Sequence, residues 1–220
     1  MPKLKVAIVG LGLGAEFIPI NQRHPDAELY AICQRNKQTM DEIGDAFGVD
    51  RRFNSFEELI ADPELDAIHI NSPIADHGWM SIAGLKAGKH VACTVPMATT
   101  VDECLQIARL SDETAKMYMM METAVYGREF LYAKDLVESG KLGKIQFMRG
   151  SHQQNMGLTG WPAYLYGFPP MHYATHAVSP LLALAVTTAE YVVCNGSCRI
   201  NDDYDAKYNS PFAAETSSIK

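Results

Sequence analysis

The sequence has no long hydrophobic run and no block of charges of one sign. No apolar stretch in its 220 residues approaches the roughly 20 residues that a membrane-spanning helix needs. Its 19 basic and 26 acidic residues give a net charge of -7 without a run of five like charges, so the basic surface typical of nucleic-acid and anionic-membrane binders is missing. We therefore expect a cytoplasmic protein with a small-molecule partner, and neither nucleic acid nor membrane as a partner.

Cysteine is scarce and scattered, which argues against disulfides and zinc. The five cysteines form no CxxC pair; they are Cys33, Cys93, Cys104, Cys194 and Cys198. His172 and His176 have a spacing that suits a metal pair, but neither an HExxH motif nor a nearby acidic third ligand accompanies them. The sequence therefore predicts no metal site.

Short apolar runs alternate with helical patterns over the first half of the chain. The runs that suit strands are 4–9, 27–33, 66–70, 90–95 and 116–121, and the helical patterns are 38–47, 77–87 and 101–114. This alternation predicts a parallel sheet flanked by helices. Strands buried on both faces are apolar throughout; 6–9 and 117–121 follow this rule, whereas His69 interrupts 66–70.

The pattern changes after about residue 123, where we expect a second domain. A helical stretch closed by Gly140 precedes 144–155, which alternates like an antiparallel strand, and a further helix is expected from His172 to about Ala185. The predicted class is α/β, with a Rossmann-type parallel-sheet domain at 1–122 and an α+β domain with a mainly antiparallel sheet at 123–220. Because the sequence ends in a strand-like stretch, we expect the second domain to be incomplete, and a naturally short form stays open.

The glycine-rich segment VAIVGLGLGAEF follows the first predicted strand. Gly10 and Gly12 occupy the first two positions of a G-x-G-x-x-G/A pattern and Ala15 the third. The first glycine permits the tight turn, the second lets a pyrophosphate approach the backbone, and a small third residue lets helix and strand pack closely. Together with Leu13 and Gly14, these residues are expected to hold the diphosphate of NAD or NADP. The alternative is a tight turn without a ligand.

The end of the second strand lacks the acid that commonly binds the adenosine ribose of NAD. Gln34, Arg35 and Asn36 stand there instead. No carboxylate at this position would repel a 2′-phosphate, and Arg35 can pair with that phosphate or stack on the adenine. Both NAD and NADP therefore stay open, and a solvated surface position is the alternative for Arg35.

These segments resemble the glucose-fructose oxidoreductase, inositol dehydrogenase and rhizopine-catabolism family (Gfo/Idh/MocA). The resemblance covers nearly the whole chain and is most specific in DAIHINSPIADHGWMSIAGLKAGKHV; it continues in LVESGKLGKI and MHYATHAVSP. It implies that Ser72, Pro73 and His77 border the nicotinamide half of the cofactor. It also implies a second domain that carries a carbohydrate or polyol substrate and makes homo-oligomer contacts.

The chain departs from this family beside the cofactor. Members typically carry Glu-Lys-Pro where this chain has Thr94-Val95-Pro96, and the family lysine commonly assists proton transfer. General acid–base help is worth about 10²- to 10⁴-fold in rate, so another group is needed. An imidazole titrates near neutral pH, and His176, which matches the family's histidine, is our first choice. His172 is expected on the same helix face, either in catalysis or merely hydrogen-bonded at a domain seam.

Three functions fit the residues. The leading one is hydride transfer between NAD(P) and a sugar or polyol. The second is redox-neutral glycoside cleavage, because METAVYGRE and the Tyr-x-Thr-His of MHYATHAVSP resemble nicotinamide-dependent glycoside hydrolases of the same superfamily. The third is a non-catalytic regulator that binds cofactor or sugar, which the missing lysine suggests.

Four aromatic residues are candidates for the substrate side of the site. In the glycoside-cleaving alternative, Tyr126 and Tyr173 would supply acid or base groups, and core packing is the alternative for Tyr126. Trp161 and Tyr164 suit stacking on a sugar ring, or they fill a subunit interface, where aromatic residues are equally enriched. Tyr173 is also expected to contact substrate.

Overall fold

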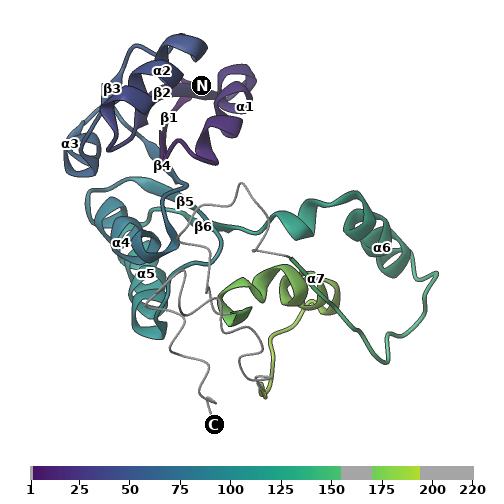
Figure 1. Ribbon diagram of the computed structural model, residues 1–220. Coiled ribbons are helices and arrows are strands. Elements are labelled where there is room, and N and C mark those ends of the chain that lie inside the picture. Colours follow the sequence, from purple (N-terminus) through teal and green to yellow (C-terminus); the bar gives the residue numbers. More distant parts are fainter. Residues whose placement is uncertain (1, 155–169, 194–220) are drawn as a thin grey trace, which may run out of the picture. The chain divides into compact units, whose positions relative to one another are not determined.

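The computed structural model describes residues 2–154 and 170–193 (Figure 1). The chain divides into two compact units, Met1–Met121 and Glu122–Lys220. The first unit contains a parallel sheet with helices on both faces, and the regular elements in the described part of the second are helices. No helix among these residues is long and apolar enough to cross a membrane.

The sheet of the first unit has six parallel strands in the order β3-β2-β1-β4-β5-β6. The strands are β1 (Leu4–Val9), β2 (Ala27–Cys33), β3 (Arg52–Phe53), β4 (Ala67–Ile70), β5 (His90–Thr94) and β6 (Tyr118–Met121). Val9 pairs with Cys33 on one side and with Ile70 on the other, so the chain order reverses at β1. In open α/β sheets, ligands bind beyond the carboxyl ends of the strands at such a reversal.

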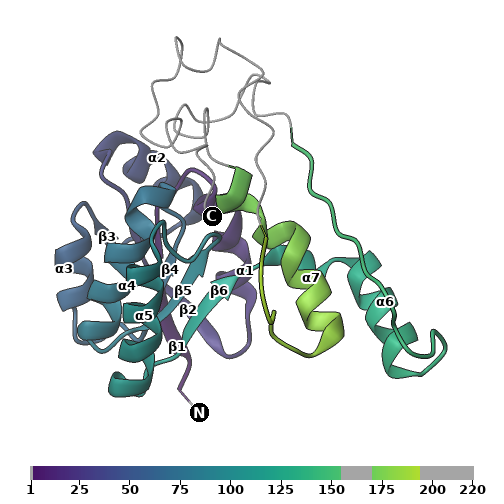
Figure 2. The same cartoon turned by 90° about the horizontal axis from the view of Figure 1, so that it is seen from below.

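Helices cover the two faces of this sheet unequally. They are η1 (Gly14–Phe17), α1 (Ile18–Arg23), α2 (Lys37–Phe47), α3 (Phe56–Ala61), η2 (Ile74–Asp76), α4 (His77–Lys86) and α5 (Val101–Thr114). Successive residues of a strand point to opposite faces: Ala7 and Val9 pack in one core cluster with α3, α4 and α5, whereas Ile8 packs in another with α1 and α2. Figure 2 shows α3, α4 and α5 on one side of the sheet and α1 on the other.

Short polar side chains fix where three of these helices begin. The N-cap side chains of Asn36, Ser55 and Thr100 each accept a hydrogen bond from the backbone amide three residues later. Such caps satisfy amides that have no partner inside the helix. As a result, Asn36 and Ser55 hold the two loops that follow β2 and β3 in fixed conformations.

The predicted parallel sheet is confirmed, and the runs 4–9, 27–33 and 101–114 match their elements residue for residue. The elements β3 and α3 were missed because two and six residues are too short to show a period. The expectation that 117–121 is buried on both faces is wrong: Met117 is 71% and Met119 45% exposed. Met117 precedes β6, and among the described residues β6 has a neighbouring strand on one side only.

The described part of the second unit contains η3 (Thr123–Tyr126), α6 (Arg128–Glu138), η5 (Pro170–Tyr173) and α7 (Thr175–Ala185). Gly140, with φ +73°, follows the end of α6 as predicted. The strand expected at 144–155 is not formed over its described part, 144–154. A strand is stable only when a neighbour pairs its backbone groups, and no described residue does so for this segment.

Candidate functional site

The glycine turn after β1 has the geometry of a phosphate-binding turn. Gly10 has φ +83°, and a Cβ atom there would lie 2.7 Å from the backbone oxygen of Asn71, so only glycine fits. A Cβ at Gly12 would have no atom within 4 Å, which means that the backbone at this point is open to a ligand. These are the two roles that the sequence pattern assigns to the first two glycines.

Close packing at this turn also involves Gly14, which precedes Ala15, the third residue of the pattern. A Cβ at Gly14 would lie 2.9 Å from Cγ2 of Ile8 and 3.2 Å from Cβ of Asn71. Ala15 lies one residue further, where its methyl group is partly buried against the α1 and α2 core cluster. Leu13, which precedes η1, is 53% exposed.

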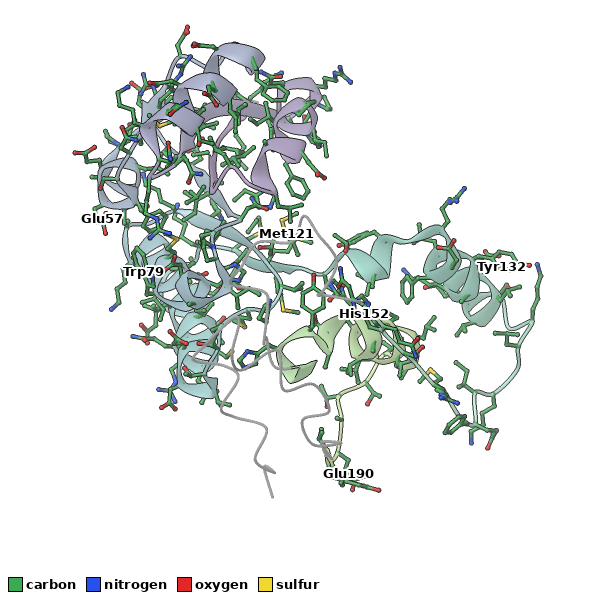
Figure 3. The ribbon with its side chains drawn as sticks, viewed as in Figure 1. Glu57, Trp79, Met121, Tyr132, His152 and Glu190 are labelled. Atoms are coloured by element: carbon green, nitrogen blue, oxygen red, sulfur yellow. The ribbon has the colours of Figure 1, made fainter. Side chains whose placement is uncertain are left out.

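A cavity of about 320 Å³ opens beside this turn. Five residues that the sequence predicted as cofactor-binding line it together: Gly10, Gln34, Arg35, Ser72 and Pro73. Sequence reasoning missed six polar or aromatic residues of the same wall: Asn54, Ser55, Phe56, Glu57, Asp76 and Trp79. Figure 3 labels Glu57 on α3 and Trp79 on α4. Asn36 is instead engaged as the cap of α2, with its Oδ1 3.0 Å from the amide of Thr39.

Buried polar atoms at this turn fit a hydrogen-bonding ligand. Oδ1 of Asn71 and Oγ of Ser72 are buried and have no hydrogen-bond partner among the described residues. A buried polar atom without a partner costs about 1–3 kcal/mol, which a ligand group can recover. The polar atoms of Asn71 and Ser72 and the open backbone at Gly12 together fit a dinucleotide bound where the strand order reverses.

His77 joins the loops that follow β4 and β5. The ring is 1% exposed; Nδ1 lies 2.8 Å from the carbonyl oxygen of Pro96 and Nε2 lies 2.9 Å from that of Ser72. Burial lowers the pKa of His77, while these two carbonyl contacts act in the opposite direction. Thr94 completes the link, because its Oγ1 donates to the carbonyl of Ile70 at 3.2 Å. His77 therefore holds the predicted nicotinamide loops together through its own ring nitrogens.

The second unit contains a close carboxylate–imidazole pair. Oε1 of Glu122 lies 2.6 Å from Nδ1 of His176, the second residue of α7. The same Oε1 accepts a hydrogen bond from the amide of Ala124 at 2.9 Å, which fixes the carboxylate at the start of η3. Glu122 is 4% exposed, and its Oε2 has no partner among the described residues.

Two further aromatic rings surround His176. The ring of Tyr173 meets it edge to face, with centroids 4.6 Å apart, and His152 lies 4.8 Å away. Figure 3 shows His152 beside α7. The pKa of Tyr173 is raised by burial and then by the charge of Glu122, so its phenol keeps its proton at neutral pH. A carboxylate, an imidazole and a protonated phenol thus meet within the second unit.

The structure corrects two expectations about this cluster. His172 does not share a helix with His176: it lies in the 3₁₀ turn η5, and Ala174 separates that turn from α7. The i, i+4 rule for a common face holds only within one α-helix, because a 3₁₀ turn has about 3.0 residues per turn. Tyr126 is 62% exposed, so core packing is wrong for it, and Tyr173 is the tyrosine that contacts His176.

Two predicted residues are not described by the structure, and two candidates in the second unit were missed by sequence reasoning. Trp161 and Tyr164 lie outside the described residues. Glu122 and His152 were not predicted, although Glu122 directly follows β6 and polar groups at the carboxyl ends of parallel strands commonly belong to sites. Within the described ranges, no three His, Cys, Asp or Glu side chains are grouped to hold a metal.

The strand order, the glycine turn and the adjoining cavity define a dinucleotide-binding protein of the Rossmann class. The model of the Gfo/Idh/MocA oxidoreductase family, described as having an NAD-binding Rossmann fold, matches residues 4–122. The chain belongs to this family, which confirms the resemblance found in the sequence.

Relatives of two kinds match the chain. A glycosyl hydrolase family 109 protein of Shewanella baltica and an α-N-acetylgalactosaminidase of Shewanella oneidensis are each 28% identical over 96% of this chain and 49% of their own length. The scyllo-inositol dehydrogenase of Lactobacillus casei, solved with bound NAD(H) and scyllo-inositol, is 28% identical with a TM-score of 0.60, covering 65% of this chain and 43% of its own. The chain spans about half the length of the curated relatives it matches.

Proposed function

We propose that this protein is an NAD-dependent enzyme that cleaves a glycosidic bond of a sugar derivative without net oxidation. The observation that carries the proposal is the contact of the buried Glu122 with the partly buried His176, with the protonated Tyr173 against the imidazole. A single hydride transfer needs one base, whereas glycoside cleavage by transient oxidation needs both a base and an acid. The second unit provides candidates for both.

The residues divide the chemistry between the two units. NAD supplies a reversible hydride acceptor when it is bound, and the turn at Gly10 and Gly12 is the part of the first unit that suits its diphosphate. His176, oriented by Glu122 through Nδ1, takes the proton of a sugar hydroxyl at Nε2. In the elimination that follows, the C–H next to the transient carbonyl loses its proton to water while Tyr173 donates its proton to the departing glycosidic oxygen, and a water molecule then adds to the resulting double bond.

The valine at position 95 supports glycoside cleavage over simple dehydrogenation. Valine has no ionisable group, so the end of β5 cannot supply the proton transfer that a lysine provides in typical family members. The curated relatives named glycosyl hydrolase and α-N-acetylgalactosaminidase agree with the cleavage reaction. A sugar or polyol dehydrogenase is the second candidate, because a scyllo-inositol dehydrogenase matches at the same identity.

A chromogenic α-N-acetylgalactosaminide separates the two candidates. We expect the full chain to release p-nitrophenol from p-nitrophenyl α-N-acetylgalactosaminide only when NAD⁺ is added, without lasting absorbance of reduced nicotinamide. Accumulation of NADH from a free sugar or polyol, without release of p-nitrophenol, would establish the dehydrogenase instead. Release that is equally fast in protein stripped of NAD would contradict both.

Replacing Glu122 by glutamine tests the carrying observation. The amide keeps an oxygen for the Ala124 backbone but loses the charge that orients and supports His176, so kcat is expected to fall by about 10²-fold or more. NADH affinity, measured by fluorescence titration, should not change. Glu129→Gln is the matched control, because Glu129 is an exposed carboxylate at the start of α6. Equal kcat values for the two variants would remove Glu122 from the mechanism.

A further inference from the structure

The cavity of the first unit has three charged side chains on its wall: Arg35, Glu57 and Asp76. Two of them form an ion pair, because Nη2 of Arg35 lies 3.9 Å from Oδ2 of Asp76. Asp76 is anchored on its other oxygen, where the indole nitrogen of Trp79 donates to Oδ1 at 2.9 Å. The guanidinium of Arg35 therefore already faces a carboxylate that is held in place.

Glu57 is the remaining charge on the cavity wall. Its Oε2 accepts a hydrogen bond from Oγ of Ser55 at 2.8 Å, and Ser55 is itself fixed as the N-cap of α3. Within residues 2–154 and 170–193, no lysine or arginine lies within 4 Å of the Glu57 carboxylate. Its pKa is lowered, first by its own backbone amide and then by Ser55, so it is ionised at neutral pH.

This carboxylate lies on the same wall as the residues that end β2. Gln34 and Arg35 take the place where nucleotide-binding sheets commonly carry an acid for the ribose hydroxyls, and neither has the two acceptor oxygens and the negative charge of a carboxylate. The loop of Glu57 is tied to this strand end, because Nδ2 of Asn54 donates to the backbone oxygen of Gln34 at 3.0 Å. An acid is therefore present at this cavity, supplied by α3 instead of β2.

We propose that Glu57 is the residue by which this protein selects NAD over NADP, accepting hydrogen bonds from the adenosine ribose hydroxyls and repelling a 2′-phosphate. The inference rests on the proposed function only in requiring that the cavity holds a nicotinamide dinucleotide. The cavity wall has two carboxylates against one guanidinium, whose Nη2 lies 3.9 Å from one of them, so the dianionic 2′-phosphate meets a wall with a net negative charge. Arg35 remains suited to stacking on the adenine.

Fluorescence titrations of the full chain with NADH and NADPH test this proposal. The unmodified protein is expected to bind NADH about tenfold more tightly than NADPH, because like charges at contact distance repel. Glu57→Gln should weaken NADH binding and bring the two affinities within about threefold of each other, a difference of less than 1 kcal/mol. Circular dichroism confirms that each variant is folded.

Glu58→Gln is the matched control. Glu58 lies in the same first turn of α3 and is exposed, so its substitution removes the same favourable interaction between a carboxylate and the N-terminus of the helix. Unlike Glu57, it does not line the cavity. The control should keep the preference of the unmodified protein. Equal binding of NADH and NADPH by the unmodified protein, or equal effects of the two substitutions, would overturn the role of Glu57. Binding of neither nucleotide would overturn the proposed function as well.

Discussion

Replacing His69 by leucine should make the stability of the first unit less sensitive to acid. His69 lies in β4 with 5% of its surface exposed, packed edge-on against Phe17 at 4.7 Å between ring centroids. Its Nε2 has no partner among the described residues, and burial lowers its pKa from 6.5 to about 4. The charged imidazole is therefore much less favourable in the folded protein than in the unfolded chain.

The sign and size of the effect follow from proton linkage. Below a pH of about 6.5 the unfolded chain binds a proton at His69 that the folded protein does not bind until about pH 4. The contribution of His69 to stability is thus complete above pH 6.5 and is lost as the pH falls toward 4. The loss is about 2 kcal/mol at a pH of about 5, and it approaches about 3 kcal/mol at the lower limit.

Urea unfolding at several pH values measures this loss. The sequence has two tryptophans, so a Trp161→Phe background leaves Trp79 as the single reporter, and Trp79 belongs to the first unit. We expect the free energy of unfolding to fall less steeply with acid in His69→Leu than in the parent, by about 2 kcal/mol between neutral pH and pH 5. Parallel curves for the two proteins would show that His69 is protonated equally easily in both states and would refute the reasoning.

Two other properties follow from burial and packing. Gly12→Ala should leave stability unchanged but weaken NADH binding, whereas Gly14→Ala should destabilise the first unit by about 1–3 kcal/mol, because its Cβ would lie 2.9 Å from Ile8; urea unfolding and NADH titration of both variants check this, and equal effects would contradict it. Cys33 and Cys93 should react with a thiol reagent only after unfolding, because burial raises the pKa of each to about 12; labelling followed by peptide mass spectrometry measures this, and rapid labelling of either in the native protein would contradict it.

The fold of the first unit was predictable because its strands and helices depend on short-range patterns. The apolar runs at 4–9 and 27–33 and the helical pattern at 101–114 have the length and period of the elements that they form. The strand expected at 144–155 had an equally suitable pattern. Its formation depends on a pairing partner elsewhere in the chain, which local periodicity does not report.

The candidate site was predictable only where backbone geometry dictates residue type. Gly10 is recognisable because a positive φ and a 2.7 Å approach to Asn71 exclude every side chain, and such positions leave a motif. Glu57 and Glu122 belong to no recognisable sequence motif, because glutamates are common at the start of a helix, where they cap the helix and interact with its dipole. Their significance comes from the cavity wall and from the 2.6 Å contact with His176, and both depend on the tertiary fold.

The two units contain different kinds of site residue, which implies that cofactor binding and catalytic turnover depend on different residues. In the first unit, both ring nitrogens of His77 contact carbonyl oxygens and Val95 has no proton to exchange, so its described site residues suit holding a cofactor better than moving protons. The second unit has the ionisable cluster of Glu122, Tyr173 and His176. Substitutions in the glycine turn should therefore raise the Kd for NADH, and substitutions in the cluster should lower kcat at unchanged Kd. A cluster variant that loses NADH affinity as severely as a glycine-turn variant would show that this division is wrong.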